Sequence, residues 1–155
     1  MKKISFGDIL SVKENAIIVH GCNNHGVMGS GIAKQIRAEY PGVYDTYTDN
    51  LAALSRTNKN PMGKVFWHLG NNQLLIANAI TQDGFGKDGR KYVSYKAIAE
   101  CFVEVAIIAE QEKLPVHYPL IGAGLGGGDW AIIADIIESV FESFPTVEHT
   151  LWIKE

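Results

Sequence analysis

The sequence predicts an α/β protein with a mixed central sheet and helices on both faces of that sheet. Two observations favour this class. Short apolar runs typical of strands alternate along the chain with longer segments of helical periodicity. Loops rich in glycine and asparagine follow several of these runs, as they do where the strands of an open α/β sheet reach its ligand-binding edge. With 155 residues, the chain is expected to form one domain, residues 1–155.

The first half of the chain is predicted to form two strands, two helices and a pair of neighbouring strands. Elements of these types are expected over residues 3–6, 16–20, 30–40, 43–54, 64–69 and 74–80. The run at 16–20, Ala-Ile-Ile-Val-His, is short and β-branched, as in a strand that is buried on both faces. Pro41-Gly42 ends the first helix. The turn Gly70-Asn71-Asn72 joins the last two strands as a hairpin, which makes the sheet mixed.

The second half is predicted to repeat a simpler alternation of loop, helix and strand. The expected elements are a loop over 81–91, a helix over 94–113, a strand over 116–121, a loop over 122–128, a helix over 130–144 and a strand over 150–153. The helix at 94–113 is the longest and carries apolar residues at helical spacing. Pro145 ends the helix that follows.

Composition and charge exclude several classes of protein. Lysine and arginine number 14 against 17 aspartates and glutamates, a net charge of −3, which argues against a general nucleic-acid binder. No apolar stretch approaches the ~20 residues of a membrane span, and the start lacks the apolar run of a secretion signal. Two cysteines, Cys22 and Cys101, are too few for a disulfide scaffold or a four-ligand zinc site. A cytoplasmic protein is expected.

Glycine is the unusual feature of the composition, with 16 residues. Four lie within 21–31, three within 84–89 and five within 122–128. Glycines let the backbone approach a ligand and turn successive N–H groups toward an anion, and helices follow two of these loops. A phosphate-containing ligand is the resulting hypothesis, and tight turns without a ligand are the alternative.

One of these loops also matches a dinucleotide-binding pattern. Gly122, Gly124 and Gly127 fit G-x-G-x-x-G between a strand and a helix. Only 28 residues follow Gly127, fewer than a dinucleotide fold needs beyond that point. A nicotinamide-dependent oxidoreductase is therefore a remote alternative.

Several polar residues stand where chemistry is expected, and each has a structural explanation as well. His20 ends a buried strand, where it is either a core residue or an acid–base group. Asp129 precedes a helix, so it either caps that helix or faces the ligand. Asp8 follows a strand and is either a turn residue or a ligand contact. A metal site built from His20, Cys22 and His25 is disfavoured, since no carboxylate or second cysteine supports it.

Together these segments resemble the macro domain family of ADP-ribose-binding modules. The most specific pieces are Val19–Asn23 leading to Met28–Ala33, and Ile121–Leu125 leading to Asp129-Trp130. The resemblance extends from Gly7-Asp8-Ile9 to the last strand. It implies a three-layer α/β/α sandwich around a mixed sheet.

The resemblance also implies roles for individual residues. Asp8 matches the acid that hydrogen-bonds the adenine amino group, with Ile9 beside it, and Asn23 matches a residue near the distal ribose. The glycine loop at the distal ribose and diphosphate corresponds to Gly29, Ser30 and Gly31. The diphosphate-binding loop corresponds to Gly122, Ala123, Gly124, Leu125 and Gly126. Trp152 lies where the family often places an aromatic against adenine, although a core role is equally compatible with its position.

Two departures from the family pattern bear on the activity. Its glycohydrolases and thymidine de-ADP-ribosylases use a lysine where this sequence has Gln82, and its glycohydrolase has an aspartate where this sequence has Gly126. An amide cannot replace a nucleophilic lysine. In the family's phosphatases the catalytic candidates are a histidine and an aspartate that His20 and Asp129 match.

The resemblance therefore implies a metal- and cofactor-independent phosphatase that converts ADP-ribose 1″-phosphate to ADP-ribose and phosphate. His20 and Asp129 are its expected catalytic residues, without an assignment of which activates water. The alternatives are a non-catalytic ADP-ribose-binding module and a hydrolase that removes ADP-ribose from protein or nucleic acid. A monomer is expected, with ADP-ribose or its 1″-phosphate as the small-molecule partner and no membrane association.

Overall fold

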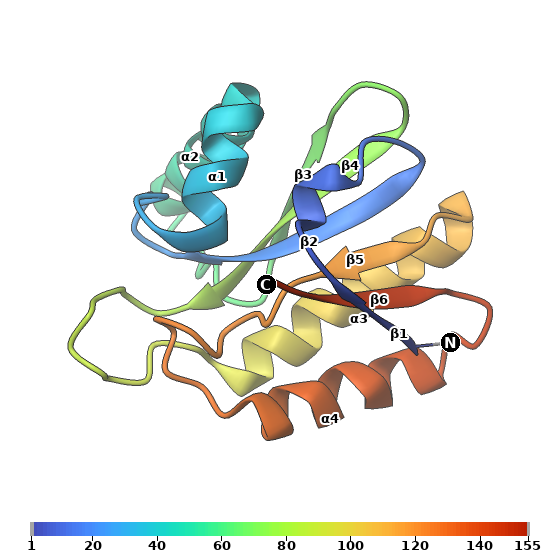
Figure 1. The fold of residues 1–155 in the computed structure, drawn as a ribbon. Coiled ribbons are helices and arrows are strands. Elements are labelled where there is room, and N and C mark those ends of the chain that lie inside the picture. Colours follow the sequence, from blue (N-terminus) through green and yellow to red (C-terminus); the bar gives the residue numbers. More distant parts are fainter. Residues whose placement is uncertain (1, 155) are drawn as a thin grey trace.

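In the computed structural model, which describes residues 2–154, strands and helices alternate along the chain (Figure 1). The strands are β1 (Lys2–Phe6), β2 (Ala16–Asn23), β3 (Val65–Leu69), β4 (Leu74–Gln82), β5 (Val116–Tyr118) and β6 (His149–Ile153). The helices are α1 (Gly31–Glu39), α2 (Pro41–Arg56), α3 (Tyr95–Glu112) and α4 (Trp130–Glu142), with a 3-10 helix, η1 (Ile9–Ser11). The predicted α/β class is confirmed.

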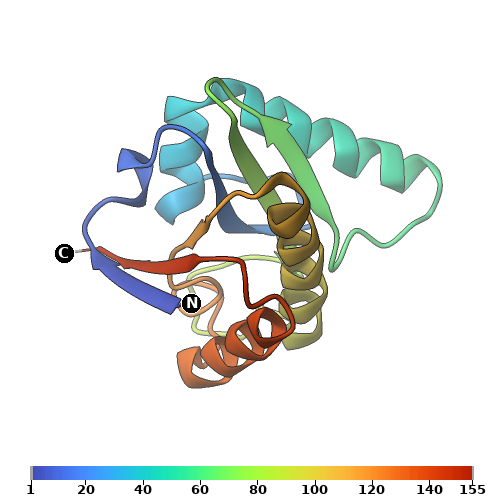
Figure 2. The ribbon, with the colours of Figure 1, turned by 90° about the vertical axis from the view of Figure 1, so that its right-hand side faces the viewer.

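The strands form one mixed sheet between two layers of helices. Their order is β1-β6-β5-β2-β4-β3, and only the β3–β4 pair is antiparallel. Helices α1 and α2 cover one face, while α3 and α4 cover the other (Figures 1 and 2). The mixed sheet and the three-layer sandwich are as predicted.

Strand β2 is buried on both faces because its residues alternate between two apolar clusters. Ile17 and Val19 pack with residues of α3 and α4. Ile18 and Cys22 pack with residues of α1 and α2. A strand flanked by helix layers on both sides carries apolar residues on both of its faces, which is why residues 16–19 show no alternation with polar residues.

The parallel strands bring the functional loops to one edge of the sheet. Strands β1, β6, β5, β2 and β4 all run in the same direction, so their carboxyl ends lie side by side in that order. The segments that leave these ends therefore follow one another across the edge. Ligands of open α/β sheets bind at such an edge.

Several element boundaries differ from the sequence prediction. Strands β2 and β4 continue to Asn23 and Gln82, beyond the predicted ends at residues 20 and 80. Two other differences have identifiable reasons. The strand expected over 116–121 ends at Tyr118, because Pro119 has no N–H with which to continue the ladder. Pro41 ends α1 as predicted, but it also occupies the first turn of α2, where a missing N–H is tolerated.

No helix within residues 2–154 is both long enough and apolar enough to cross a lipid bilayer.

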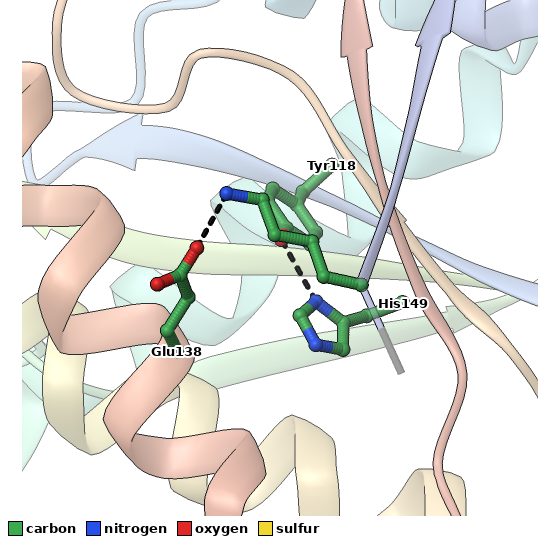
Figure 3. A network of polar contacts seen from close by, with 4 residues as sticks. Tyr118, Glu138 and His149 are labelled. Carbon is green, nitrogen blue, oxygen red and sulfur yellow. Dashed lines mark hydrogen bonds and ion pairs between the residues drawn. The ribbon is translucent and has the colours of Figure 1, made fainter.

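His149, the first residue of β6, has a buried side chain that lies against Tyr118 of β5 (Figure 3). His149 is 4% exposed, its Nδ1 lies 2.9 Å from the Tyr118 hydroxyl, and its ring stacks on Phe141 with centroids 4.1 Å apart. Beside this pair, Lys2 of β1 bonds Glu138 of α4. Burial is the main reason that the pKa of His149 is lowered from 6.5 to about 4.

This histidine makes the fold sensitive to acid. The unfolded chain protonates the imidazole near pH 6.5, whereas the folded protein does so only near pH 4, so stability is lost as the pH falls between these values. For His149 alone we expect the free energy of unfolding to fall by about 1.3 kcal/mol between pH 7.5 and 5.5. Urea unfolding at both pH values measures it.

The matched variant is His149→Phe, which keeps a ring against Phe141 but cannot titrate. His20, whose pKa burial also lowers to about 4, still contributes in that variant. His117, whose pKa burial also lowers, contributes too. We therefore expect the pH-dependent loss in His149→Phe to be smaller than that of the wild-type protein by about 1.3 kcal/mol. Equal losses in the two proteins would contradict the prediction.

Candidate functional site

A cleft of about 420 Å³ crosses the edge of the sheet at which the parallel strands end. Its lining comes from the segments that follow β1, β6, β5, β2 and β4. Of the twelve ligand-binding residues predicted from the sequence, eleven line it: Asp8, Ile9, Asn23, Gly29, Ser30, Gly31, Gly122, Gly124, Leu125, Gly126 and Trp152. The twelfth, Ala123, is absent from the lining and packs instead against the cluster of α3 and α4.

The glycine loop after β5 is folded so that three consecutive amides stay free. The carbonyl of Gly126 accepts hydrogen bonds from the N–H groups of Tyr92 and Val93 at 2.7 and 3.0 Å. The N–H groups of Gly124, Leu125 and Gly126 have no acceptor within the described chain, and all three residues line the cleft. Successive free amides of this kind form a concave site for an anion.

A second set of free amides comes from the loop after β2 and the start of α1. None of the N–H groups from residue 29 to residue 33 has an acceptor within residues 2–154, and all five residues line the cleft. Ser30 stands at the N-cap of α1 but makes no side-chain capping bond. The positive end of the helix dipole is thus open to a ligand.

Asn23 shapes this loop from within. Its Oδ1 accepts the N–H of His25 at 2.9 Å, and its Nδ2 donates to the Val27 carbonyl at 2.8 Å. The buried Tyr47 hydroxyl lies 2.9 Å from the same Oδ1 and accepts the N–H of Gly26 at 3.1 Å. Although Asn23 lines the cleft, most of its bonding capacity is therefore used to fix the loop.

One end of the cleft combines a carboxylate with an aromatic wall. Asp8 caps η1 through Oδ1, which accepts the N–H of Leu10 at 2.9 Å, and its second oxygen has no partner in the described chain. Trp152 of β6 and Lys154 line the cleft beside it. The indole N–H of Trp152 donates to Nδ1 of His117 at 2.9 Å.

The other end is formed by the segment that follows β4. Gln82, Phe85 and Lys87 line the cleft here, and none of the three was among the predicted site residues. Asn24 holds this segment against the first glycine loop, because it donates to Asp83 and accepts the N–H of Gly84, each at 3.0 Å. Position at the end of a parallel strand is the sequence signal that could have identified these residues.

His20 does not reach the cleft. It is fully buried on the sheet face covered by α1 and α2, and its Nε2 lies 2.6 Å from Oδ1 of Asn78. Asn78 in turn donates to the Phe66 carbonyl at 3.0 Å. Its predicted role as a catalytic residue near the terminal phosphate does not fit this placement, because the strand directs the imidazole into the core.

Asp129 also lies outside the cleft lining. Its Oδ1 accepts the N–H of Ala131 at 2.9 Å, so the side chain caps α4, and its own N–H donates to the Tyr95 hydroxyl at 3.0 Å. Of the two roles that the sequence left open for Asp129, helix cap or ligand contact, the structure shows the helix cap. A direct catalytic contact for Asp129 is not supported by this geometry.

Cys22, His20 and Asn78 lie together but do not form an activated nucleophile. The Cys22 sulfur lies at nearly equal distances, 3.8 and 3.7 Å, from Nδ1 and Nε2 of His20. Burial raises the pKa of the Cys22 thiol and lowers that of His20 to about 4. Both groups are therefore neutral at pH 7, which opposes a thiolate–imidazolium pair.

The cleft therefore offers main-chain donors in its centre and few ionisable side chains. Those that line it are Asp8, Cys22, Lys87 and Lys154. Within residues 2–154, no three side chains of His, Cys, Asp or Glu converge as metal ligands would. The arrangement is suited to binding an elongated ligand whose negative charge lies in the middle.

Comparison with known proteins agrees with this geometry. The sequence model of the macro domain family matches residues 19–137. The chain is 26% identical to the ADP-ribose 1″-phosphate phosphatase of Candida albicans, over 96% of this chain and 94% of that protein. It is 27% identical to the DNA ADP-ribosyl glycohydrolase of Mycobacterium tuberculosis, over 94% of this chain but 40% of that protein.

Solved structures share this fold. A crystal structure of a protein from Bacteroides thetaiotaomicron superposes with a TM-score of 0.85 at 25% identity, covering 97% of this chain and 99% of that one. A macrodomain protein from Streptomyces coelicolor superposes with a TM-score of 0.78 at 26% identity, covering 97% of this chain and 98% of that one. The family match spans most of the chain and contains both glycine loops of the cleft. This chain belongs to the macro domain family.

Proposed function

We propose that this protein binds ADP-ribose in the cleft and hydrolyses ADP-ribose 1″-phosphate to ADP-ribose and phosphate. The observation that carries the proposal is the convergence of two sets of free amides, residues 29–33 and 124–126, on the middle of one cleft. They follow β2 and β5, the two central strands of the edge. A diphosphate between two sugars places its charge at that point.

The ends of the cleft suit the two ends of ADP-ribose. The free oxygen of Asp8 can accept a hydrogen bond from an exocyclic amine, and Trp152 offers an aromatic surface to a base. The distal ribose then lies toward Gln82 and Lys87, at the end of β4. This direction follows from the strand order, which separates β1 and β6 from β4.

The chemistry proposed for the phosphatase relies on charge stabilisation. A terminal phosphate on the distal ribose would lie near Lys87 and the free amides of the first glycine loop. These donors stabilise the charge that develops on the phosphoryl oxygens as water attacks phosphorus and the ribose oxygen leaves. The full-length similarity to the Candida albicans phosphatase supports this reaction.

A second candidate is the removal of ADP-ribose from a macromolecule. It is favoured by Lys87, which lines the cleft from the segment after β4, near the position where a ribose-attacking lysine is expected. Lys87 is exposed, however, whereas nucleophilic lysines lie in desolvated pockets. The phosphatase therefore remains the first proposal.

Two measurements on the purified protein test the proposal. Calorimetry with ADP-ribose measures binding, and release of inorganic phosphate from ADP-ribose 1″-phosphate measures turnover. Binding with phosphate release supports the phosphatase. Binding without release, even at high enzyme concentration, leaves the non-catalytic module, and loss of ADP-ribose from a modified protein or nucleic acid would establish the second candidate. Failure to bind ADP-ribose would overturn the assignment of the cleft.

Asp8→Asn tests the adenine end of the cleft. The asparagine oxygen can still cap η1, but the free carboxylate oxygen is then replaced by an NH₂ group, which cannot accept a hydrogen bond. If the amide turns the other way, the ligand meets an uncharged oxygen, which is a weaker acceptor than a carboxylate. We expect the Kd for ADP-ribose to rise at least about tenfold, because a hydrogen bond to a charged group is lost. Calorimetry measures this, and Asp135→Asn on the exposed side of α4 is the matched control. Equal Kd values for both variants would refute the contact.

A further inference from the structure

Within residues 2–154, the side chain of Trp152 makes one polar contact, and it holds the indole in the cleft wall. It lies on β6, and its indole Nε1 donates a hydrogen bond to Nδ1 of His117 on β5, at 2.9 Å. The two rings have centroids 6.0 Å apart and planes tilted by 49°. Trp152 lines the cleft, whereas His117 does not, so the histidine stands behind the wall.

The direction of this hydrogen bond fixes the protonation state of His117. The indole N–H can only donate, so Nδ1 of His117 must present a lone pair. The imidazole is therefore neutral and carries its proton on Nε2. A second proton on Nδ1 would place two N–H groups against each other and remove the contact.

The surroundings of His117 favour the neutral form. Its neighbours in the sheet are Ile18 of β2 and Thr150 of β6, which are uncharged. Lys3 of β1, paired with Glu148 at 3.6 Å, is the charged group that acts on it. Burial, and after it the charge of Lys3, lower the pKa of His117 below 6.5.

We propose that His117 is a positioning residue that holds Trp152 in the wall of the cleft, and that protonation of its imidazole releases the indole and weakens ligand binding. The inference rests on the proposed function in one respect: the ligand that reports it is ADP-ribose. Affinity is thereby linked to pH through a residue that does not touch the ligand. The linkage has a definite sign, with binding strongest where His117 is neutral.

The first experiment is calorimetry with ADP-ribose at pH 7.5 and 5.5 on three proteins. For the wild type we expect the Kd to rise between pH 7.5 and 5.5 by up to about fivefold, the effect of one hydrogen bond lost in those molecules in which His117 is protonated. His117→Asn offers an acceptor oxygen that does not titrate, so its Kd should stay near the wild-type value at pH 7.5 and change little with pH. His117→Leu has no acceptor, so its Kd should be raised about fivefold at both pH values.

His25 is the control for the opposite end of the cleft. It is exposed, and its ring lies 6.0 Å from that of Phe85, which lines the cleft. His25→Asn should keep the wild-type pH dependence. Far-UV circular dichroism at pH 5.5 confirms that every variant is folded under the conditions of the measurement.

A second measurement makes the inference independent of ADP-ribose binding. In ¹⁵N-labelled protein without ligand, the Nε1–H resonance of Trp152 should shift as the pH falls through the titration of His117, and should stay constant in His117→Asn. A resonance that does not follow pH in the wild type, or a His117→Leu protein that binds ADP-ribose as the wild type does, would overturn the proposal. If no protein binds ADP-ribose at pH 7.5, the proposed function fails and the resonance still decides the role of His117.

Discussion

Gly127→Ala is expected to lower the free energy of unfolding by about 3 kcal/mol and to abolish measurable ADP-ribose binding. Gly127 has φ +73°, a conformation that an L side chain adopts with strain. A Cβ at this position would stand 2.4 Å from the Arg90 carbonyl oxygen and 2.9 Å from the Cα of Lys91, both of which are backbone atoms. The loop can relieve this overlap only by moving.

That movement would reach the ligand site directly. The segment before Gly127 carries the free amides of residues 124–126. Gly126 also accepts hydrogen bonds from the segment 90–93, and the new methyl group would push this segment away. The two effects, on stability and on binding, therefore share one cause. Urea unfolding and calorimetry with ADP-ribose measure them separately.

Gly89→Ala is the matched control for backbone strain. Gly89 also has a left-handed backbone, with φ +80°, but a Cβ there would meet no atom within 4 Å, and the residue does not line the cleft. We expect this variant to lose about 1 kcal/mol of stability and to keep the wild-type Kd. If Gly127→Ala behaved in the same way as Gly89→Ala, close packing of the loop against residues 90 and 91 would not be what holds the ligand-binding amides of residues 124–126 in place.

The second large effect is expected at His20, on stability rather than on chemistry. His20→Ala would open a cavity in the core and leave Oδ1 of Asn78 without its partner at 2.6 Å. Together these changes are expected to lower the free energy of unfolding by about 3 kcal/mol, a large share of the total stability of a domain. Urea unfolding measures the loss at pH 7.5.

Phosphate release then separates a structural role from a catalytic one. At a temperature at which the variant is folded, we expect His20→Ala to retain a rate per folded molecule within about threefold of the wild type, because the imidazole does not line the cleft. Asp129→Ala should likewise keep its rate and lose only about 1 kcal/mol through the missing helix cap. If a folded His20→Ala protein released phosphate a hundredfold more slowly than the wild type, His20 would have a catalytic role after all.

If His20→Ala does not fold, His20→Gln provides the same comparison. The glutamine side chain is long enough to keep an amide group near Asn78 and fills more of the space. The expected result is a smaller loss of stability and a rate near that of the wild type. A severe loss of rate in a stable His20→Gln protein would again contradict the structural role.

The glycine loops show how far the sequence alone could identify the site. Their composition predicted an anion-binding edge, and residues of both loops line the cleft. The prediction succeeded because glycine content is local and because parallel strands bring their carboxyl ends together whatever the details of packing. The order of the strands could not be derived in this way, since it depends on contacts between distant segments. That order places β1 and β6 at the end of the cleft proposed for adenine.

The polar residues show the limit of the same reasoning. Asp8, which follows the first strand and adjoins none of the glycine loops, lines the cleft, while His20 and Asp129, which adjoin those loops, do not. His117 was assigned no role from the sequence, yet it bonds the tryptophan of the cleft wall. Nothing in the local sequence distinguishes a side chain that faces the ligand from one that faces the core or a helix end.

The sequence by itself determined the α/β class, the helices and strands to within a few residues, and the edge of the sheet that carries the ligand loops. These features follow from hydrophobic periodicity and turn residues, which act over short stretches of chain. The tertiary structure decided which polar groups meet at the cleft. Side-chain direction depends on how strands and helices pack, so His20 is a core residue, Asp129 caps a helix, and main-chain amides supply most of the site.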